Sequence, residues 1–200
     1  MLRHIVFTQG RSGSNFLVRT LNSHPEVVNY GEVFSDWTPL SKLRQLMNTV
    51  GFTNVDYLEF LYDSKTIYNC AQLWNLCART RNGKSRNFKL LKNTKTLGIK
   101  EFGIHFDKFE AQEFLLKNPD ISIIYLFREN IIQRYLSLVS LGRRGVISTE
   151  SSRVSADKMY IDIDEALVRL EDLSRKRQYE QSLIDSLNGN PILPLRYEDA

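Results

Sequence analysis

The stretch FTQGRSGSNFL, residues 7–17, decides the fold. Its apolar start is interrupted by the turn Gly10-Arg11-Ser12-Gly13-Ser14, after which apolar residues return at the spacing of a helix. A strand, a turn of small residues and a helix start are the parts of a phosphate cradle, because N–H groups at a helix N-terminus point at the ligand. The stretch therefore predicts a strand–turn–helix unit with an anion site, and an ordinary turn with a surface Arg is the alternative.

The sequence argues against a nucleoside triphosphate as that anion. The phosphate loop of ATP and GTP enzymes has a Lys-Ser/Thr pair after its second Gly, whereas Asn15-Phe16 follows Ser14 here. Those enzymes also end a core strand with an Asp that helps to hold magnesium, but the apolar run 121–127 is followed by Arg128. An Arg at that place attracts an anion and repels a cation, so we expect no metal site. A structural ion pair is the alternative role for Arg128.

Apolar runs and helical spacing together predict the fold class. We expect strands at 5–7, 97–99, 121–127 and 192–195, a fifth at 27–28, and helices at 16–21, 40–50, 55–62, 109–116, 130–141 and 163–187. Strands that alternate with helices indicate an α/β fold, with a parallel sheet flanked by helices. Ligands of such sheets bind beyond the carboxyl ends of the strands, where the Gly10 turn, Lys100 and Arg128 are expected.

Composition and charge limit the class of protein. The 200 residues are 42% hydrophobic, which suits one domain over 1–200. The net charge of +4 suits an anionic ligand but is too small to indicate nucleic acid. No apolar run approaches the ~20 residues that span a bilayer, and the first strand leaves no room for a signal peptide. We therefore expect a cytoplasmic protein without stable membrane insertion; the sequence carries no signal for an oligomeric state.

Three further segments give expectations that a structure can test. Residues 142–157 are rich in Ser and Gly and predict a mobile loop. Residues 79–95 contain seven basic side chains and no acid, which indicates a solvated surface or, as the alternative, a surface for an acidic acceptor. Cys70 and Cys77 are seven residues apart, on one face of a helix, and we expect them to be buried free thiols.

Four segments together resemble one enzyme family. GRSGSNFL (10–17), NSHPEVVNYGEVF (22–34), YLFRENIIQRYLSL (125–138) and ILPLRYED (192–199) are similar, in this order, to sulfotransferases that use 3′-phosphoadenosine-5′-phosphosulfate, PAPS. The nearest variety is the bacterial carbohydrate and Nod-factor type, which is related to the tyrosylprotein enzymes. The resemblance implies a fold like that of the P-loop nucleotide hydrolases. Relatives continue beyond the last segment, so we expect either a short member or a chain that lacks C-terminal elements.

The resemblance also implies a cofactor site. Arg11, Ser12, Gly13, Ser14 and Asn15 match the segment that holds the 5′-phosphosulfate, with Arg11 on the bridging oxygen and Asn15 in place of the usual Thr. Arg128 and Ser137 match the Arg and Ser that bind the 3′-phosphate, although their separation of nine residues is one longer than usual. Tyr197 matches an aromatic residue near the adenine. A sulfonate carries less charge than a terminal phosphate, so Arg11 replaces a metal clamp.

The transfer also needs a base that activates the acceptor hydroxyl. Glu32 matches the position of the catalytic Glu in tyrosylprotein and bacterial relatives, and a capping or surface carboxylate is its alternative role. Lys100 matches a strand-end Lys that contacts the sulfonate, and a surface Lys is its alternative role. The His that other members place two residues later is absent, since Phe102 stands there, and His105 is the nearest His and the other candidate base.

The sequence thus predicts transfer of a sulfonate from PAPS to an acceptor hydroxyl, with release of adenosine 3′,5′-bisphosphate. A carbohydrate or lipid-linked sugar is the favoured acceptor. Two alternatives stay open: a triphosphate-dependent kinase on the same fold, and a non-catalytic module that binds an anion or nucleotide.

Overall fold

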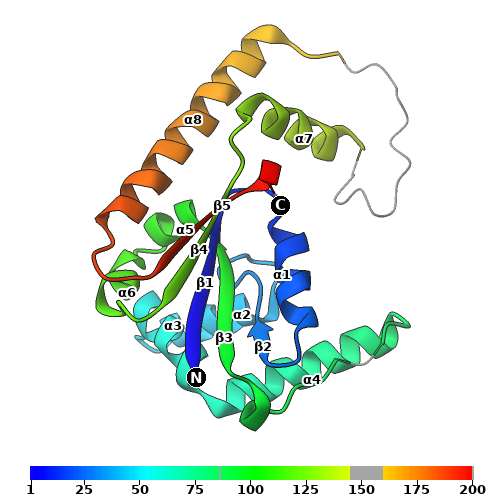
Figure 1. Cartoon of the computed structure of the whole chain (residues 1–200), viewed down its shortest axis with the longest axis vertical. Helices are drawn as coiled ribbons and strands as arrows, with labels where there is room; N and C mark the ends of the chain where they lie inside the picture. Colours follow the sequence, from blue (N-terminus) through cyan, green and yellow to red (C-terminus); the bar gives the residue numbers. More distant parts are fainter. Residues whose placement is uncertain (86, 145–159, 200) are drawn as a thin grey trace.

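Five parallel strands form the centre of the chain. The computed structural model describes residues 1–85, 87–144 and 160–199. The strand order is β2-β3-β1-β4-β5, and every neighbouring pair is parallel. The strands are β1 (Leu2–Thr8), β2 (Val27–Asn29), β3 (Thr96–Phe102), β4 (Ser122–Phe127) and β5 (Ile192–Arg196). The α/β fold with a parallel sheet is therefore confirmed, with a strand at each of the five expected places (Figure 1).

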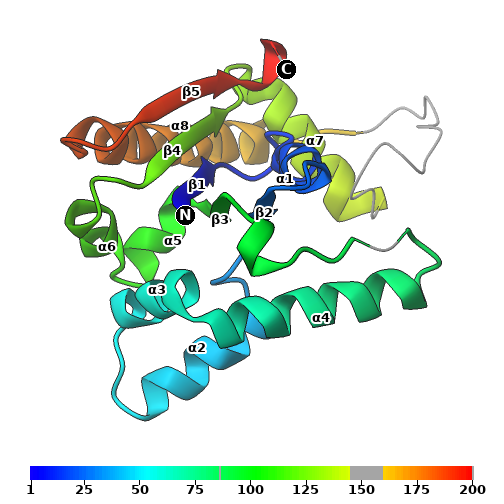
Figure 2. The same ribbon diagram turned by 60° about the horizontal axis from the view of Figure 1, so that its bottom comes forward.

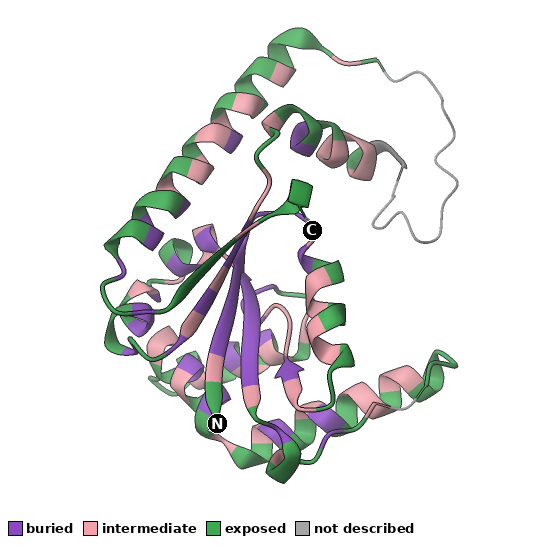
Figure 3. Cartoon of the chain, in the orientation of Figure 1, coloured by how far each residue is buried: buried purple, intermediate pink, exposed green. Residues whose placement is uncertain are grey.

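The interior of the sheet explains why the apolar runs became strands. Ile5, Val6 and Phe7 of β1 are fully buried, because other parts of the protein pack against both faces of this strand. The edge strand β5 is largely exposed, and Figure 3 shows the change from the buried central strands to this edge. Phe7 stacks on Phe106 at a ring-centre distance of 5.7 Å, so an aromatic core joins the sheet to the helices that follow β3.

The helices surround the sheet on both faces. They are α1 (Ser14–Ser23), α2 (Pro39–Thr49), α3 (Asn54–Asp63), α4 (Lys65–Arg81), α5 (Gly103–Lys108), α6 (Gln112–Lys117), α7 (Ile131–Arg144) and α8 (Ile163–Ser186), with short 3₁₀ turns η1 (Leu91–Asn93) and η2 (Tyr197–Asp199). Helix α1 lies on one side of the sheet and α5, α6 and α8 lie on the other (Figure 1). Helices α2, α3 and α4 form a separate group below the sheet in the turned view of Figure 2. No helix within the described ranges is both long and apolar enough to cross a bilayer.

Three sequence expectations were wrong in detail. The helix expected at 109–116 begins only at Gln112, as α6, because Glu110 adopts a positive φ of 50° before it, and the preceding short helix α5 was not expected. The thiols of Cys70 and Cys77 are exposed rather than buried, since Tyr68 and Gln72 occupy the inward face of α4. Residues 142–144, expected in a mobile loop, are the last turn of α7, and 145–157 lie outside the described residues.

Candidate functional site

The turn between β1 and α1 forms a cradle at the carboxyl end of the sheet. Ser12 is fully buried, and its Oγ donates to the carbonyl of Gln9 (2.6 Å) and lies 2.6 Å from Thr8 Oγ1. Arg11 and Gly13 both have positive φ, 67° and 78°, which curls the backbone around the start of α1. The first N–H groups of a helix have no partner within it, and they carry partial positive charge. The cradle therefore presents donors suited to an anion.

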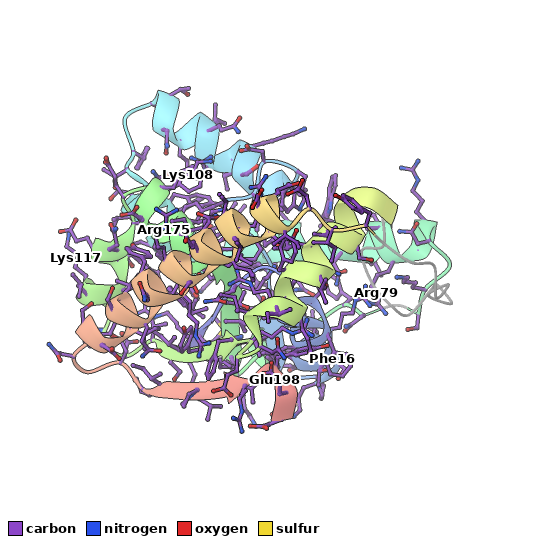
Figure 4. The ribbon with its side chains drawn as sticks, turned by 90° about the horizontal axis from the view of Figure 1, so that it is seen from above. Phe16, Arg79, Lys108, Lys117, Arg175 and Glu198 are labelled. Atoms are coloured by element: carbon purple, nitrogen blue, oxygen red, sulfur yellow. The ribbon has the colours of Figure 1, made fainter. Side chains whose placement is uncertain are left out.

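A cleft of about 700 Å³ opens beside this cradle. Its walls come from the cradle and α1, from the end of β4 and the start of α7, and from the end of β5 with η2. Figure 4 shows two of its residues, Phe16 and Glu198, next to each other beside α7. The cleft is lined by all eight residues predicted to bind the cofactor: Arg11, Ser12, Gly13, Ser14, Asn15, Arg128, Ser137 and Tyr197.

Arg128 follows β4 and lines the cleft next to the cradle, with its Nη1 3.4 Å from the carbonyl oxygen of Arg11. Its guanidinium lies 4.5 Å from the centre of the Tyr197 ring and donates to Gln133 Oε1 at 2.8 Å. No hydrogen-bond partner is found for its buried Nε among the described residues. The alternative role expected for Arg128, a structural ion pair, is not found among the ion pairs of the described residues, although the charge of Arg128 helps to lower the pKa of Glu198.

Ser137 and Arg11 meet directly across the cleft. Arg11 Nε donates to Ser137 Oγ at 2.9 Å, which ties the cradle to α7. The resemblance assigns Ser137, with Arg128, to a 3′-phosphate and Arg11 to the 5′ side. The structure instead joins Ser137 to Arg11, although both line the same cleft as Arg128.

Tyr197 packs onto the cradle. A Cβ added to Gly13 would lie 2.7 Å from the Tyr197 ring, so this position has room for glycine alone. The next residue, Glu198, accepts from the N–H groups of Asn130 (3.0 Å) and Glu129 (3.2 Å). Burial opposes ionisation of Glu198, but these donors outweigh it and hold its pKa below the usual value. A charged carboxylate thus lies in the cleft beside the cations Arg11, Arg19 and Arg128.

Two buried charged residues under the cradle, Arg134 and Glu180, were not among the site residues predicted from the sequence. Arg134, 5% exposed, donates to the carbonyl of Gly10 (3.0 Å) and to Gln9 Oε1 (2.5 Å). Glu180 of α8 is 2% exposed, and burial raises its pKa to about 7. The only signal for Arg134 was its position three residues before Ser137, on the same helix face. Glu180 belongs to a helix rich in charged residues and gave no signal at all.

Glu32 and Lys100 form an ion pair at a second place, near the end of β3. Lys100 Nζ contacts Glu32 Oε1 directly, and Ser35 Oγ donates to Glu32 Oε2 at 2.5 Å. The Lys100 side chain is 3% exposed and that of Glu32 is 13% exposed. The structure therefore brings these two predicted residues together, but neither belongs to the lining of the cleft.

Glu101 fixes the loop that carries Glu32. Its fully buried carboxylate accepts from the N–H groups of Val33 and Phe34 through Oε2, each at 2.9 Å. Its Oε1 accepts from the N–H of Phe102 at 2.9 Å and lies 2.7 Å from His105 Nδ1. If Nδ1 carries the proton in this contact, Nε2 of His105 is left as the basic nitrogen.

The described residues contain no cluster of three or more His, Cys, Asp or Glu side chains that could hold a metal ion. Cations and helix N–H groups, rather than carboxylates, thus dominate the cleft.

A scan of protein-family models finds no match to this chain, and a search of curated proteins finds no relative.

Proposed function

We propose that the chain is a PAPS-dependent sulfotransferase with the corresponding P-loop-like fold. The observation that carries the proposal is the convergence of the eight predicted cofactor residues on one cleft. These residues lie in three separate segments of the sequence, at 11–15, at 128–137 and at 197. An accidental resemblance gives no reason for all of them to face one cavity.

The cleft fits the proposed cofactor in size and charge. Its volume of about 700 Å³ lies within the ~300–1,000 Å³ of ordinary small-molecule sites. The α1 N-terminus and Arg11 would hold one anionic group, and the guanidinium of Arg128, which also lines the cleft, would hold another. Tyr197 and the exposed Phe16 supply aromatic surface for a base at the cleft.

PAPS, when bound, supplies the sulfonate: its bond to the phosphate oxygen breaks while a bond to the acceptor oxygen forms. Arg11, held by Ser137, stabilises the charge that develops on the phosphate oxygen. Glu32 takes the proton of the acceptor hydroxyl. Because Glu32 is paired with Lys100, it has to exchange that contact for the acceptor before it can act.

His105 is the second candidate base, and one contact favours it. Glu101 orients its ring through Nδ1, in the arrangement by which a buried carboxylate orients a basic imidazole. The side chain is 19% exposed, so an acceptor hydroxyl could reach it.

The two other function classes differ from this proposal in a measurable way. A kinase would require a triphosphate and magnesium. The cradle lacks the Lys-Ser/Thr pair of triphosphate enzymes, and β4 is followed by Arg128 rather than by an Asp that could help to hold magnesium. A non-catalytic anion-binding module is favoured by the position of Glu32 and Lys100 outside the cleft lining. Turnover of PAPS against a panel of sugars, lipid-linked sugars and phenols separates that module from an enzyme.

Ligand choice tests the proposal directly. Adenosine 3′,5′-bisphosphate should stabilise the fold without magnesium and more than ADP does. At a hundredfold excess over its dissociation constant the gain is about 2.7 kcal/mol. Thermal shifts with the bisphosphate, ADP and ATP, with and without magnesium, measure this order. Equal shifts for the bisphosphate and ADP would exclude a 3′-phosphate site, and a shift that needs ATP and magnesium would favour a kinase.

Arg128→Gln tests where the second anion binds. Loss of a charge-assisted contact costs about 1.5–3 kcal/mol, so bisphosphate affinity should fall about tenfold or more while ADP affinity changes little. Arg175→Gln, an exposed cation on α8, is the matched control and should leave both affinities unchanged. Calorimetric titration measures them, and equal losses for both ligands would place Arg128 at the 5′ group or in the fold.

A further inference from the structure

The outward face of α4 is an apolar stripe. Cys70, Leu73, Trp74 and Cys77 follow one another at the spacing of a single helix face, and all four are exposed. Leu73 is 53% exposed and Trp74 is 64% exposed. The inward face is taken by Tyr68 and Gln72, so the stripe points away from the protein. Helix α4 extends beyond the sheet as an arm (Figures 1 and 2).

Basic residues follow the apolar stripe at the end of α4, and no acidic residue is near them in the sequence. No Asp or Glu occurs between Asp63 and Glu101. Arg81 lies one turn after Cys77 on the same face, and Lys84 follows it; both are exposed. The α4 stripe thus combines exposed apolar side chains with a basic end.

We propose that α4 docks the protein on an anionic membrane surface. In such docking the apolar face of a helix enters the boundary between headgroups and acyl chains, while basic residues meet the anionic headgroups. Leu73 and Trp74 would be the inserted side chains, with Arg81 and Lys84 on the headgroups. The helix lies on the membrane and does not cross it.

Two other occupants explain less of this surface. Phosphates of a nucleic acid would neutralise Arg81 and Lys84 but would leave the apolar side chains in water. A stable protein partner needs roughly 800 Å² on each side, whereas the stripe is four side chains on two turns, about 11 Å of helix. An acyl boundary accepts a stripe of this size without shape complementarity.

Vesicle binding tests the proposal. Co-sedimentation of the whole chain, under reducing conditions, is measured with vesicles of phosphatidylcholine alone and of phosphatidylcholine and phosphatidylserine in equal parts. We expect binding to the second kind, with a blue shift of Trp74 fluorescence in a Trp37→Phe background. Leu73→Ser with Trp74→Ser should abolish binding, and Arg81→Gln with Lys84→Gln should weaken it about 25-fold, about fivefold for each charge.

The control removes the same charge elsewhere. Lys108 and Arg175 lie on the side of the molecule opposite Arg79, which belongs to the last turn of α4 as Arg81 does, as Figure 4 shows. Lys108→Gln with Arg175→Gln should therefore leave vesicle binding unchanged. The proposal would be overturned if the chain did not bind the mixed vesicles, or if this control lost as much binding as the Arg81 and Lys84 variant. It would also be overturned if the chain sedimented as a dimer that the serine substitutions convert to a monomer. None of these readouts depends on PAPS.

Discussion

Single residues at the cleft and beside the Glu32–Lys100 pair are held by contacts with residues that are distant in the sequence. Gly13 is held in a left-handed conformation against the Tyr197 ring, which lies near the other end of the sequence. Glu101 accepts three hydrogen bonds from backbone N–H groups, lies 2.7 Å from His105 Nδ1, and so joins β3 to the loop after β2. Residues of this kind are where one substitution should have the largest effect.

Gly13→Ala should destabilise the protein, and Gly10→Ala should not. A left-handed residue with a Cβ costs about 1–2 kcal/mol, and at Gly13 the Cβ also meets Tyr197 at 2.7 Å. A Cβ added to Gly10 would meet no heavy atom of the described residues within 4 Å, its chain neighbours aside, so Gly10 is the matched control in the same turn. Urea unfolding gives both free energies. Equal losses would show that the turn, and not the contact with Tyr197, sets the requirement for glycine.

Glu101→Gln should cost about 2–3 kcal/mol, because an amide turns one donor toward N–H groups that the carboxylate satisfies. Glu198→Gln is the comparison: that carboxylate also accepts from two N–H groups, but it is exposed and water can replace it. Its loss should stay below about 1 kcal/mol. Chemical unfolding of both variants measures the difference, and similar losses would remove the special role of Glu101.

At the scale of elements, the sequence predicted what local pattern controls. The runs at β1, β3 and β4 are apolar because both faces of these strands are covered. Of α4, the sequence predicted only that Cys70 and Cys77 share one helix face; its bounds were not predicted, since its large apolar residues Leu73 and Trp74 point outward. The cradle was predictable because its Gly and Ser residues are consecutive. The pairing of Glu32 with Lys100, the group of Arg134 and Glu180, and the clamp of Glu101 depend on how strands and helices align, which local pattern does not encode.

The contact of α8 with the cradle should make stability depend on pH. Burial raises the pKa of Glu180 from 4.5 to about 7, against the opposing effects of a hydrogen bond with Gln9 and of the charge of Arg134. The folded state therefore binds this proton more tightly than the unfolded state does. The stability that the proton contributes is present below about pH 4.5 and is lost as the pH rises through about 7, a change of about 3 kcal/mol.

The variant Glu180→Gln removes this titration, so its free energy of unfolding should lack the loss between about pH 5 and about pH 8. Glu171→Gln, on the exposed side of the same helix, should keep it. Denaturant unfolding at both pH values measures the two slopes. If Glu180→Gln shows the same pH dependence as the parent chain, the carboxyl is ionised throughout and the assignment is wrong.

At the scale of the whole molecule, the cleft is a junction of three segments. Its walls come from the cradle before α1, the start of α7 and the end of β5, which are far apart in the sequence. Central β1 and β3 are buried, whereas β5 is an exposed edge that, among the described strands, is hydrogen-bonded to β4 alone. An anion that bridges the cradle and Arg128 would therefore stabilise the outer parts of the sheet more than its centre.

Amide hydrogen exchange can detect this bridging as a pattern along the chain. With adenosine 3′,5′-bisphosphate we expect slower exchange in three separate segments: residues 10–17, the first turns of α7, and residues 195–198. Helix α4 serves as the internal control, because it does not line the cleft and its exchange should be unchanged. ADP should slow exchange in the cradle but less in α7, since it lacks the group that Arg128 would hold. Slowing confined to the cradle for both nucleotides would show that the three segments do not form one ligand site.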